Sequence, residues 1–340
     1  MRRHKPYERV MERSSILYQS DDGSILVLDI PRSLEESQTL PGQIPLSRRL
    51  ISAQPVTEPY VTPEPKRARG GHATLAGAQN KSPAAQIADL MTAAVAQDAL
   101  DHCSHHFHAD YCLPRLLEGP PVAGETFTPA GARSLHGSLQ ELSNQVREEA
   151  PVFDLIMMDP PWPNRSVRRK TDNYSTVYRL EDMQRLLHHI PVPSHLSHSG
   201  LVALWITNKS SILDFVKELL ASWRLEQVAE WTWLKVTASG EPIYPIDSEW
   251  RKPWEKLIIA KRAGAATPAG LQSKTIIAVP DLHSRKPSLQ RLFADILPPQ
   301  YSGLEVFARN LTAGWWSWGD DVLKFQQNVH WSSPDDADRP

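Results

Sequence analysis

The sequence predicts an α/β fold with a largely parallel sheet covered on both faces, preceded by a partly disordered N-terminal extension. After residue 150, apolar runs of strand length alternate with amphipathic helical patterns, which is typical of such sheets. All eleven tryptophans also lie after residue 150, whereas six of the 29 prolines fall between Pro41 and Pro65. The aromatic C-terminal half is therefore expected to hold most of the core.

Length, composition and charge exclude several classes of protein. No window approaches ~20 consecutive apolar residues, so we expect no membrane span. The basic start, residues 1–6, is followed by no apolar stretch of signal-peptide type. Cys103 and Cys112 are the only cysteines and make no disulfide framework, which fits a reducing compartment. Because the net charge is −2, nucleic-acid binding would depend on local basic patches.

The N-terminal segment, residues 1–40, is predicted to form a hairpin. Two apolar runs within residues 15–30 flank Asp21-Asp22-Gly23, a turn with glycine where positive φ is needed. Residues 41–81 are rich in proline and read as a loose basic linker. Its cluster of Lys66, Arg67 and Arg69 is compatible with a nuclear-import signal, a nucleic-acid contact or solvated linker charge.

Residues 82–149 are predicted to be a helical part of the catalytic domain or an adjunct to it. A helix begins with Ser82 as N-cap and Pro83 in the first turn. One face carries the apolar side chains of Ile87, Leu90, Met91, Ala94 and Val95. Four histidines and the two cysteines crowd residues 102–112, which suggests zinc, but the spacing matches no standard finger. We therefore expect loop and core residues there and no metal.

Residues 150–328 are predicted to be the catalytic domain, with a disordered tail over residues 329–340. A helix capped by Ser210 carries a full apolar stripe, and another helix is expected to open at Pro287. The strands of the sheet are expected within residues 152–158, 201–207, 228–236, 256–261, 275–279 and 304–308. In such sheets ligands bind beyond the carboxyl ends of the strands.

Asp159-Pro160-Pro161-Trp162 follows a buried strand directly, at the edge where this sheet would present a site. The string suits methylation of an exocyclic amine. The Asp159 carboxylate and the Pro160 carbonyl can accept the two N–H bonds of the amine and aim its lone pair at a methyl donor, while Pro161 stiffens the turn. Trp162 offers a face for an extruded base. The plain alternative is a structural Asp-Pro turn.

The segment Phe153–Trp162 resembles the signature of N6-adenine methyltransferases, in the family of the messenger-RNA adenosine methyltransferase seventy-kilodalton subunit. The series of matching strings resembles the methyltransferase-like protein four branch most. The resemblance implies a Rossmann-like, S-adenosylmethionine-dependent methyltransferase fold with permuted, β-class motif order. The other matching strings lie at residues 164–169, 205–208, 228–235, 252–255, 283–287, 305–311, 314–319 and 322–325.

The resemblance also implies which residues bind the donor. Lys286 matches a lysine that meets the methionine carboxylate, and a lysine point charge suits an anion. Arg309 and Asn310 resemble ribose and adenine contacts, whereas Phe307 is either a donor contact or a packing residue. The remaining donor-side residues implied are Asp159, Asp320 and Asp321. Relatives usually carry an amide after the glycine that Asp320 and Asp321 follow, and a carboxylate cannot donate. This departure leaves the ribose contacts open.

Basic residues predict the substrate side. The loop after the tetrapeptide is rich in cations and is placed to hold phosphates, unless it is a flexible solvated loop. Its candidate contacts are Asn164, Arg165, Arg168, Arg169, Lys170 and Tyr174. A second cluster of Arg251, Lys252 and Trp254 is expected in the same cleft, with Glu255 orienting the substrate or a lysine.

The sequence and the resemblance together predict an S-adenosylmethionine-dependent N6-adenine methyltransferase acting on RNA or DNA. The branch resembled implies the 2′-O-methylated adenosine of a small nuclear RNA, action without a partner subunit, and a nuclear location, with a cytoplasmic one also open. DNA adenine is the rival substrate because it presents the same base edge. Two other classes stay open, a catalytically silent nucleic-acid-binding scaffold and an amide or small-amine methyltransferase.

Overall fold

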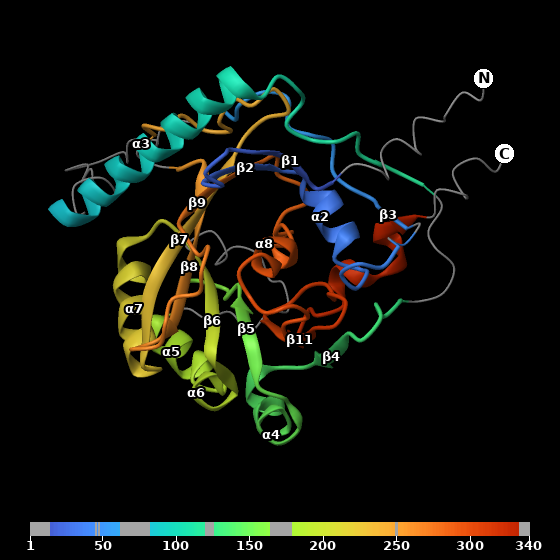
Figure 1. Ribbon diagram of the computed structural model, residues 1–340, viewed down its shortest axis with the longest axis vertical. Coiled ribbons are helices and arrows are strands. Elements are labelled where there is room, and N and C mark those ends of the chain that lie inside the picture. The colour runs from blue at the N-terminus through green and yellow to red at the C-terminus, as the bar shows by residue number, and fades with distance from the viewer. Residues whose placement is uncertain are drawn as a thin grey trace, which may run out of the picture.

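A ten-stranded mixed sheet forms the centre of the computed structural model (Figure 1). The structure describes residues 14–44, 46, 48–61, 82–119, 126–163, 179–248 and 251–332. The strands lie in the order β1-β2-β9-β7-β8-β6-β5-β10-β11-β4. Six of the nine neighbouring pairs are parallel, which confirms the predicted α/β class with a mostly parallel sheet.

Strand β5 lies in the parallel part of the sheet, and both of its faces are buried. In β5 (Phe153–Met158), Ile156 and Met158 pack into one apolar cluster, and Leu155 and Met157 pack into the cluster on the opposite face. Alternate side chains of a strand point to opposite faces, so a continuous apolar run is required here. The parallel partners on each side are β6 (Leu196–Ile206) and β10 (Gly303–Val306), followed by β11 (Trp316–Gly319) and β4 (Arg133–His136).

The other half of the sheet mixes directions. Strand β8 (Trp254–Arg262) runs antiparallel to both β6 and β7 (Leu225–Lys235), and β7 is parallel to β9 (Lys274–Ala278). All six strand segments predicted after residue 150 are therefore strands, each shifted by a few residues at its ends. Strands β4 and β11 were not predicted, and β11 carries the tryptophans Trp316 and Trp318.

Helices cover both faces of the sheet (Figure 1). In α7 (Ser210–Ser222) the predicted stripe from Ile212 to Leu220 is buried, as expected. The helix expected at Pro287 begins later, as α8 (Gln290–Ala294). The remaining helices of this part are α4 (Leu139–Glu149), α5 (Leu180–Leu187) and α6 (Val192–His195). Ser138 and Glu141 close a capping box on α4, which fixes the helix start beside β4.

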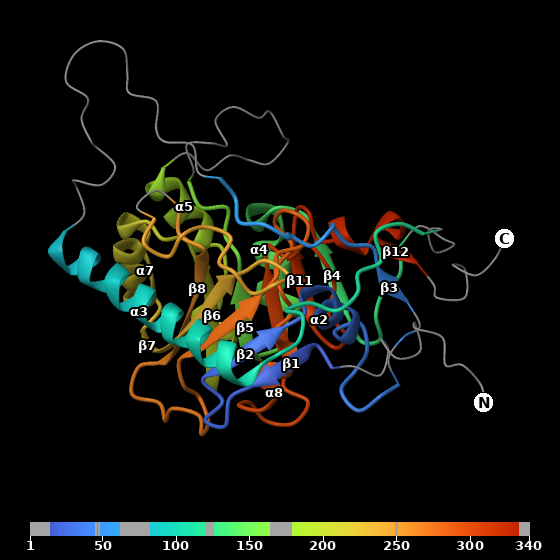
Figure 2. The ribbon, with the colours of Figure 1, turned by 90° about the horizontal axis from the view of Figure 1, so that it is seen from above.

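Helix α3 (Pro83–His106) begins at the predicted Ser82 cap, and the apolar face named from the sequence is exposed. Ile87, Leu90, Met91 and Val95 are 53–70% exposed, and Ala94 is exposed as well. The buried side is narrower and made of Thr92, Ala96, Ala99 and Cys103, which pack near β9 and β7. Figures 1 and 2 show α3 beside the end of the sheet that β2 and β9 form. Helix periodicity gave the stripe but not its direction.

The predicted hairpin is confirmed as β1 (Ile16–Gln19) and β2 (Ile25–Leu28). It is not a separate unit, because β2 pairs with β9 and extends the main sheet. Asp29 then caps α2 (Ile30–Glu36) and also accepts a hydrogen bond from the Leu113 backbone at 2.8 Å. Burial raises the pKa of Asp29 to about 6, against the hydrogen bonds from Arg32 and Leu113.

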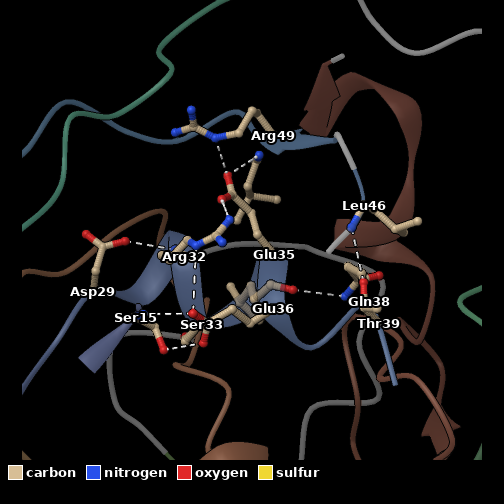
Figure 3. Close-up of polar contacts among 12 residues, drawn as sticks. Ser15, Asp29, Arg32, Ser33, Glu35, Glu36, Gln38, Thr39, Leu46 and Arg49 are labelled. Atoms are coloured by element: carbon tan, nitrogen blue, oxygen red, sulfur yellow. Dashed lines mark hydrogen bonds and ion pairs between the residues drawn. The ribbon is translucent and has the colours of Figure 1, made fainter. Parts of the chain in front are cut away.

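Polar contacts of α2 connect this helix to Ser15 and to residues 49–50 (Figure 3). Glu35 pairs with Arg32 at 3.2 Å and with Arg49 at 2.8 Å, and it accepts the Leu50 backbone N–H at 2.9 Å. Glu36 accepts the Ser15 backbone N–H at 2.8 Å. These groups are nearly all buried, and each carboxylate is satisfied by several donors. We call Arg32, Glu35, Glu36 and Arg49 the α2 charge cluster.

The boundaries predicted for the linker and the tail need correction. Residues 49–61 are anchored: β3 (Arg49–Leu50) pairs with β12 (Trp331–Ser332), and Ala53 donates to Asp281 at 2.7 Å. Strand β12 lies beyond the predicted domain end at 328, and Trp331 is buried. It follows two short turns of 3₁₀ helix, η2 (Lys324–Gln326) and η3 (Asn328–His330). The basic cluster at 66–69 lies outside the described residues.

Two questions raised by the sequence have direct answers in the described part of the chain. No helix there combines the length and apolar character that crossing a membrane requires. No group of three or more His, Cys, Asp or Glu side chains there is arranged to hold a metal ion. His102 instead contacts the Tyr18 hydroxyl at 2.7 Å and stacks on His106, while Cys103 is buried.

Candidate active site

The carboxyl ends of four neighbouring parallel strands carry the residues of the predicted donor side. Asp159 follows β5, the segment from Phe307 to Asn310 follows β10, Asp320 follows β11 and Gly137 follows β4. Because these strands are parallel, their carboxyl ends share one edge of the sheet. A cavity of about 690 Å³ opens beside that edge and is lined by Asp159, Pro160, Trp162, Glu255, Lys286 and Arg309, among others. The predicted edge is therefore the place where the structure has a cavity.

Asp159 is held between two cations. One oxygen of its carboxylate lies 3.2 Å from Lys286 Nζ, and the other lies 3.5 Å from Arg309 Nη1. Arg309 Nη1 also donates to the Ser284 carbonyl at 3.2 Å. The Asp159 side chain is 21% exposed, so the two cations orient it while a ligand in the cavity can still reach it.

The rest of the tetrapeptide is anchored to β6. The Trp162 backbone N–H donates to the Pro160 carbonyl at 2.8 Å, which leaves one of the two lone pairs of that oxygen for a ligand. The Trp162 indole N–H donates to the Trp205 carbonyl at 2.8 Å, and the ring meets Phe215 edge to face. Trp162 is only 8% exposed, so a base can meet only the small part of the ring that reaches the cavity. Pro161 is half-buried between these anchors.

A row of alternating charges runs along the cavity. Lys235 pairs with Glu255, Glu255 pairs with Lys286 at 2.8 Å, and Lys286 continues to Asp159. We call Lys235, Glu255, Lys286, Asp159 and Arg309 the catalytic charge row. Burial alone would raise the pKa of Glu255, but Lys286 and Lys235 lower it to about 2. Burial alone would lower the pKa of Lys286, but Asp159 and Glu255 raise it. Glu255 and Lys286 are therefore both ionised at neutral pH.

Glu305, in β10, is a site residue that the sequence did not single out for a role. Burial and the charge of Asp159 raise its pKa to about 7, against the lowering effect of Arg309. With Lys286, Asn310 and Trp315 it lines a narrow space of about 20 Å³ behind the main cavity. The signal was present in the sequence, since an acidic side chain stands inside an apolar strand at residues 304–308. A carboxyl group half-ionised near pH 7 beside Asp159 is a candidate proton carrier or hydrogen-bond donor.

The predicted donor side is gathered at the ends of β10 and β11. Phe307 has φ of 61°, a strained value for an aromatic residue, and its ring is buried in the core. A Cβ at Gly319 would lie 3.2 Å from Phe307 Cα, so glycine is needed for this close approach. The ring of Phe307 therefore packs in the core, the second of the two roles expected, and its backbone shapes the turn.

The acidic pair that departs from the family pattern lies at the end of β11. Burial and the neighbouring Asp321 and Glu141 raise the pKa of Asp320, while His136 opposes them. The Asp320 backbone carbonyl contacts His136 Nε2 at 2.9 Å, and Asp321 contacts Lys324 at 3.3 Å. These contacts place the end of β4 beside the predicted donor residues.

The predicted substrate side is only partly visible. Asn164, Arg165, Arg168, Arg169, Lys170 and Tyr174 lie outside the described residues. Glu255 and Lys252 line the cavity, and Lys252 Nζ donates to the Ile246 carbonyl at 3.3 Å and lies over the Trp254 ring. Trp254 is only 1% exposed and packs in the core, so the structure corrects its expected role from base contact to wall of the cleft.

Comparisons with known proteins agree with this geometry. Residues 153–321 match the model of the MT-A70 family. The chain is 47% identical over 330 residues to the N6-methyladenosine RNA methyltransferase MTA1 of Cryphonectria parasitica, an alignment that covers 94% of this chain and 95% of that protein. It is 41% identical over 187 residues to the human N(6)-adenine-specific methyltransferase METTL4 (52% and 38% covered). It is 34% identical over 178 residues to a Caenorhabditis elegans DNA N6-methyl methyltransferase (52% and 47% covered).

Proposed function

The chain belongs to the MT-A70 family of N6-adenine methyltransferases, and on that premise we propose that it methylates the N6 amino group of adenosine in RNA, using S-adenosylmethionine. The observation that carries the proposal is Asp159 at the carboxyl end of β5. Its carboxylate is fixed by Lys286 and Arg309 and opens to a cavity of about 690 Å³. A fully packed Asp-Pro turn would leave no such space.

Asp159 and Pro160 orient the amine in this proposal. The N6 nitrogen of adenine is a poor nucleophile because its lone pair is delocalised into the ring. A carboxylate oxygen of Asp159 and the free lone pair of the Pro160 carbonyl accept the two N–H bonds, which turns the nitrogen lone pair toward the donor. Trp162 holds the loop in that geometry through its bond to β6. The rate gain comes from orientation and preorganised charge.

The residues present fit S-adenosylmethionine, on which MT-A70 methyltransferases depend. That donor supplies an electrophilic methyl group on a sulfonium, together with one carboxylate, one ammonium and two ribose hydroxyls. Lys286 would hold the carboxylate of the donor. The carboxyl groups of Asp159 and Glu305 would accept hydrogen bonds from its ammonium group. The carboxyl group of Asp320 or Asp321 would accept hydrogen bonds from its ribose hydroxyls. Arg309 and Asn310 complete the donor side. A side chain at Gly319 would meet the backbone of Phe307 and Ala308, so the glycine leaves room for this turn.

RNA is favoured over DNA by the names of the relatives. A relative that matches almost the whole chain is named an RNA methyltransferase, while the one reported above that is named for DNA is matched over 47% of its length. The proposed refinement is an adenosine whose ribose is 2′-O-methylated, as in small nuclear RNA. We also propose that the chain acts in the nucleus without a partner subunit, which epitope-tag imaging and activity at increasing dilution would test.

The test is transfer of a tritiated methyl group from S-adenosylmethionine to matched oligonucleotides. Four substrates are compared: RNA, RNA with a 2′-O-methylated target adenosine, the DNA of the same sequence, and a peptide. We expect wild type to label RNA most and the peptide not at all, and Asp159→Ala to label none. Binding of RNA without transfer by wild type would instead support the silent scaffold.

A further inference from the structure

The strap formed by residues 51–61 crosses the rim of the catalytic cavity. The Pro-rich linker predicted for this region is in fact pinned at three points. Ala53 donates to Asp281 at 2.7 Å, the Val56 carbonyl accepts from the Ala238 N–H at 2.7 Å, and the Tyr60 N–H donates to the Ile243 carbonyl at 2.9 Å. In Figure 2 this blue segment runs from β3 along the upper side of the molecule. The strap therefore places Tyr60 at a fixed point of the rim.

Tyr60 meets a second tyrosine there, and an arginine joins them. The rings of Tyr60 and Tyr244 have centroids 5.4 Å apart. Arg251 Nη1 donates to the Tyr244 hydroxyl at 2.9 Å, and its guanidinium lies 5.6 Å from the centre of that ring. Tyr60 is 46% exposed and Arg251 is exposed, so this aromatic-basic group faces solvent rather than the core. All three residues line the same cavity as Asp159.

Tyr244 is carried by backbone that adjoins the end of β7, several strands away from the strand that Asp159 follows. Ile243, next to Tyr244, bonds back to Lys235 at the end of β7, with its N–H 3.1 Å from the Lys235 carbonyl. Strands β8 and β6 separate β7 from β5, which carries Asp159. Three strand spacings of about 4.8 Å put the ends of β7 and β5 roughly 14 Å apart. A nucleic-acid chain whose target adenine lies at Asp159 would therefore reach Tyr60 with a neighbouring nucleotide.

We infer that Tyr60, Tyr244 and Arg251 form a stacking platform for a nucleotide that flanks the target adenosine. The inference rests on the proposed function only for the identity of the central base. Exposed aromatic rings beside an arginine are the combination that binds single-stranded nucleic acid, because rings stack with any base and the guanidinium attracts a phosphate. The platform thus contributes affinity and context preference while the target base is read at Asp159.

The experiment measures binding of fluorescently labelled single-stranded RNA to the full chain. We expect Tyr60→Ala to weaken binding about 5- to 100-fold, since stacking on one aromatic residue contributes about 1–3 kcal/mol. Tyr60→Phe keeps the ring and should bind within about twofold of wild type. Val61→Ala is the matched control, because Val61 is the next residue of the strap and 92% exposed.

An RNA series locates the platform and separates stacking from misfolding. One flanking position of the RNA at a time is made abasic. At one of these positions, the loss of the base should weaken binding by wild type as much as Tyr60→Ala weakens binding to intact RNA. Tyr60→Ala should bind that abasic RNA no more weakly than it binds intact RNA. 2-Aminopurine at that position should be quenched by wild type and not by Tyr60→Ala. The platform would be overturned if Tyr60→Ala bound every abasic RNA more weakly than wild type by the same factor. It would also be overturned if Tyr60→Ala bound intact RNA as tightly as wild type.

Methyl transfer on the same RNAs keeps the two proposals apart. If wild type transfers no methyl group but Tyr60→Ala still loses binding at one flanking position, the proposed function fails and the platform stands. If wild type methylates RNA while Tyr60→Ala leaves binding and KM unchanged, the platform alone fails.

Discussion

The molecule contains two clusters of buried or half-buried ion pairs, and the clusters differ in their surroundings. In the α2 charge cluster, Glu35 is closed off by Arg32, Arg49 and the Leu50 backbone N–H, while Arg32 and Glu36 border a cavity of about 330 Å³. In the catalytic charge row, Asp159 and Glu255 face three cations and border a cavity of about 690 Å³. Ion pairing alone therefore does not mark a site. The catalytic charge row differs by its one cation in excess and by its place at the carboxyl ends of parallel strands.

The largest effect is expected from breaking the α2 charge cluster. Glu35→Ala leaves Arg32 and Arg49 without their shared carboxylate in a buried place. Removing one partner of a buried pair costs about 3–5 kcal/mol. Urea denaturation should show that loss of stability, while protein that remains folded keeps its kcat. Glu58→Ala, at an exposed position of the strap, is the control. A large fall in kcat of folded Glu35→Ala would contradict the division between the clusters.

The catalytic charge row should respond in the opposite way. Lys286→Met removes the cation shared by Asp159 and Glu255 and the proposed partner of the donor carboxylate. We expect kcat/KM for S-adenosylmethionine to fall about 10²–10³-fold, the usual effect of losing one preorganised charge contact. Calorimetric titration of the donor should show weaker binding, with a smaller loss of stability than in Glu35→Ala. Normal donor binding by Lys286→Met would exclude Lys286 from the donor site.

A smaller effect concerns pH and Glu305. Its pKa is about 7 in the folded chain and about 4.5 ordinarily, so the unfolded chain loses the proton first as pH rises. Wild type therefore loses stability from about pH 4.5 to about pH 7, relative to Glu305→Gln, which mimics the protonated form. We expect this difference to reach roughly 1–3 kcal/mol. Asp29, whose pKa is also raised, is present in both proteins and cancels in the difference. A difference that does not change with pH would contradict this assignment.

The sequence predicted the site better than it predicted the surroundings of the site. Asp159 could be placed because an apolar strand and a rigid tetrapeptide adjoin in sequence. The role of Glu305 could not be predicted, because its raised pKa depends on Asp159 from another strand. Which face of α3 is buried could not be predicted, because periodicity shows that an apolar stripe exists and not where it points. Tyr60 was hidden in an apparent linker, since its anchors lie nearly 200 residues away along the chain.

The most direct test of the central claim is the identity of the methylated nucleoside. RNA is incubated with S-adenosylmethionine and with wild type or Asp159→Asn, digested to nucleosides and analysed by mass spectrometry. Asparagine keeps the size of the side chain and removes the charge that Lys286 and Arg309 hold. The account predicts N6-methyladenosine from wild type and at least about 10²-fold less from Asp159→Asn. Equal N6-methyladenosine from both proteins, or methylation at another atom, would contradict it.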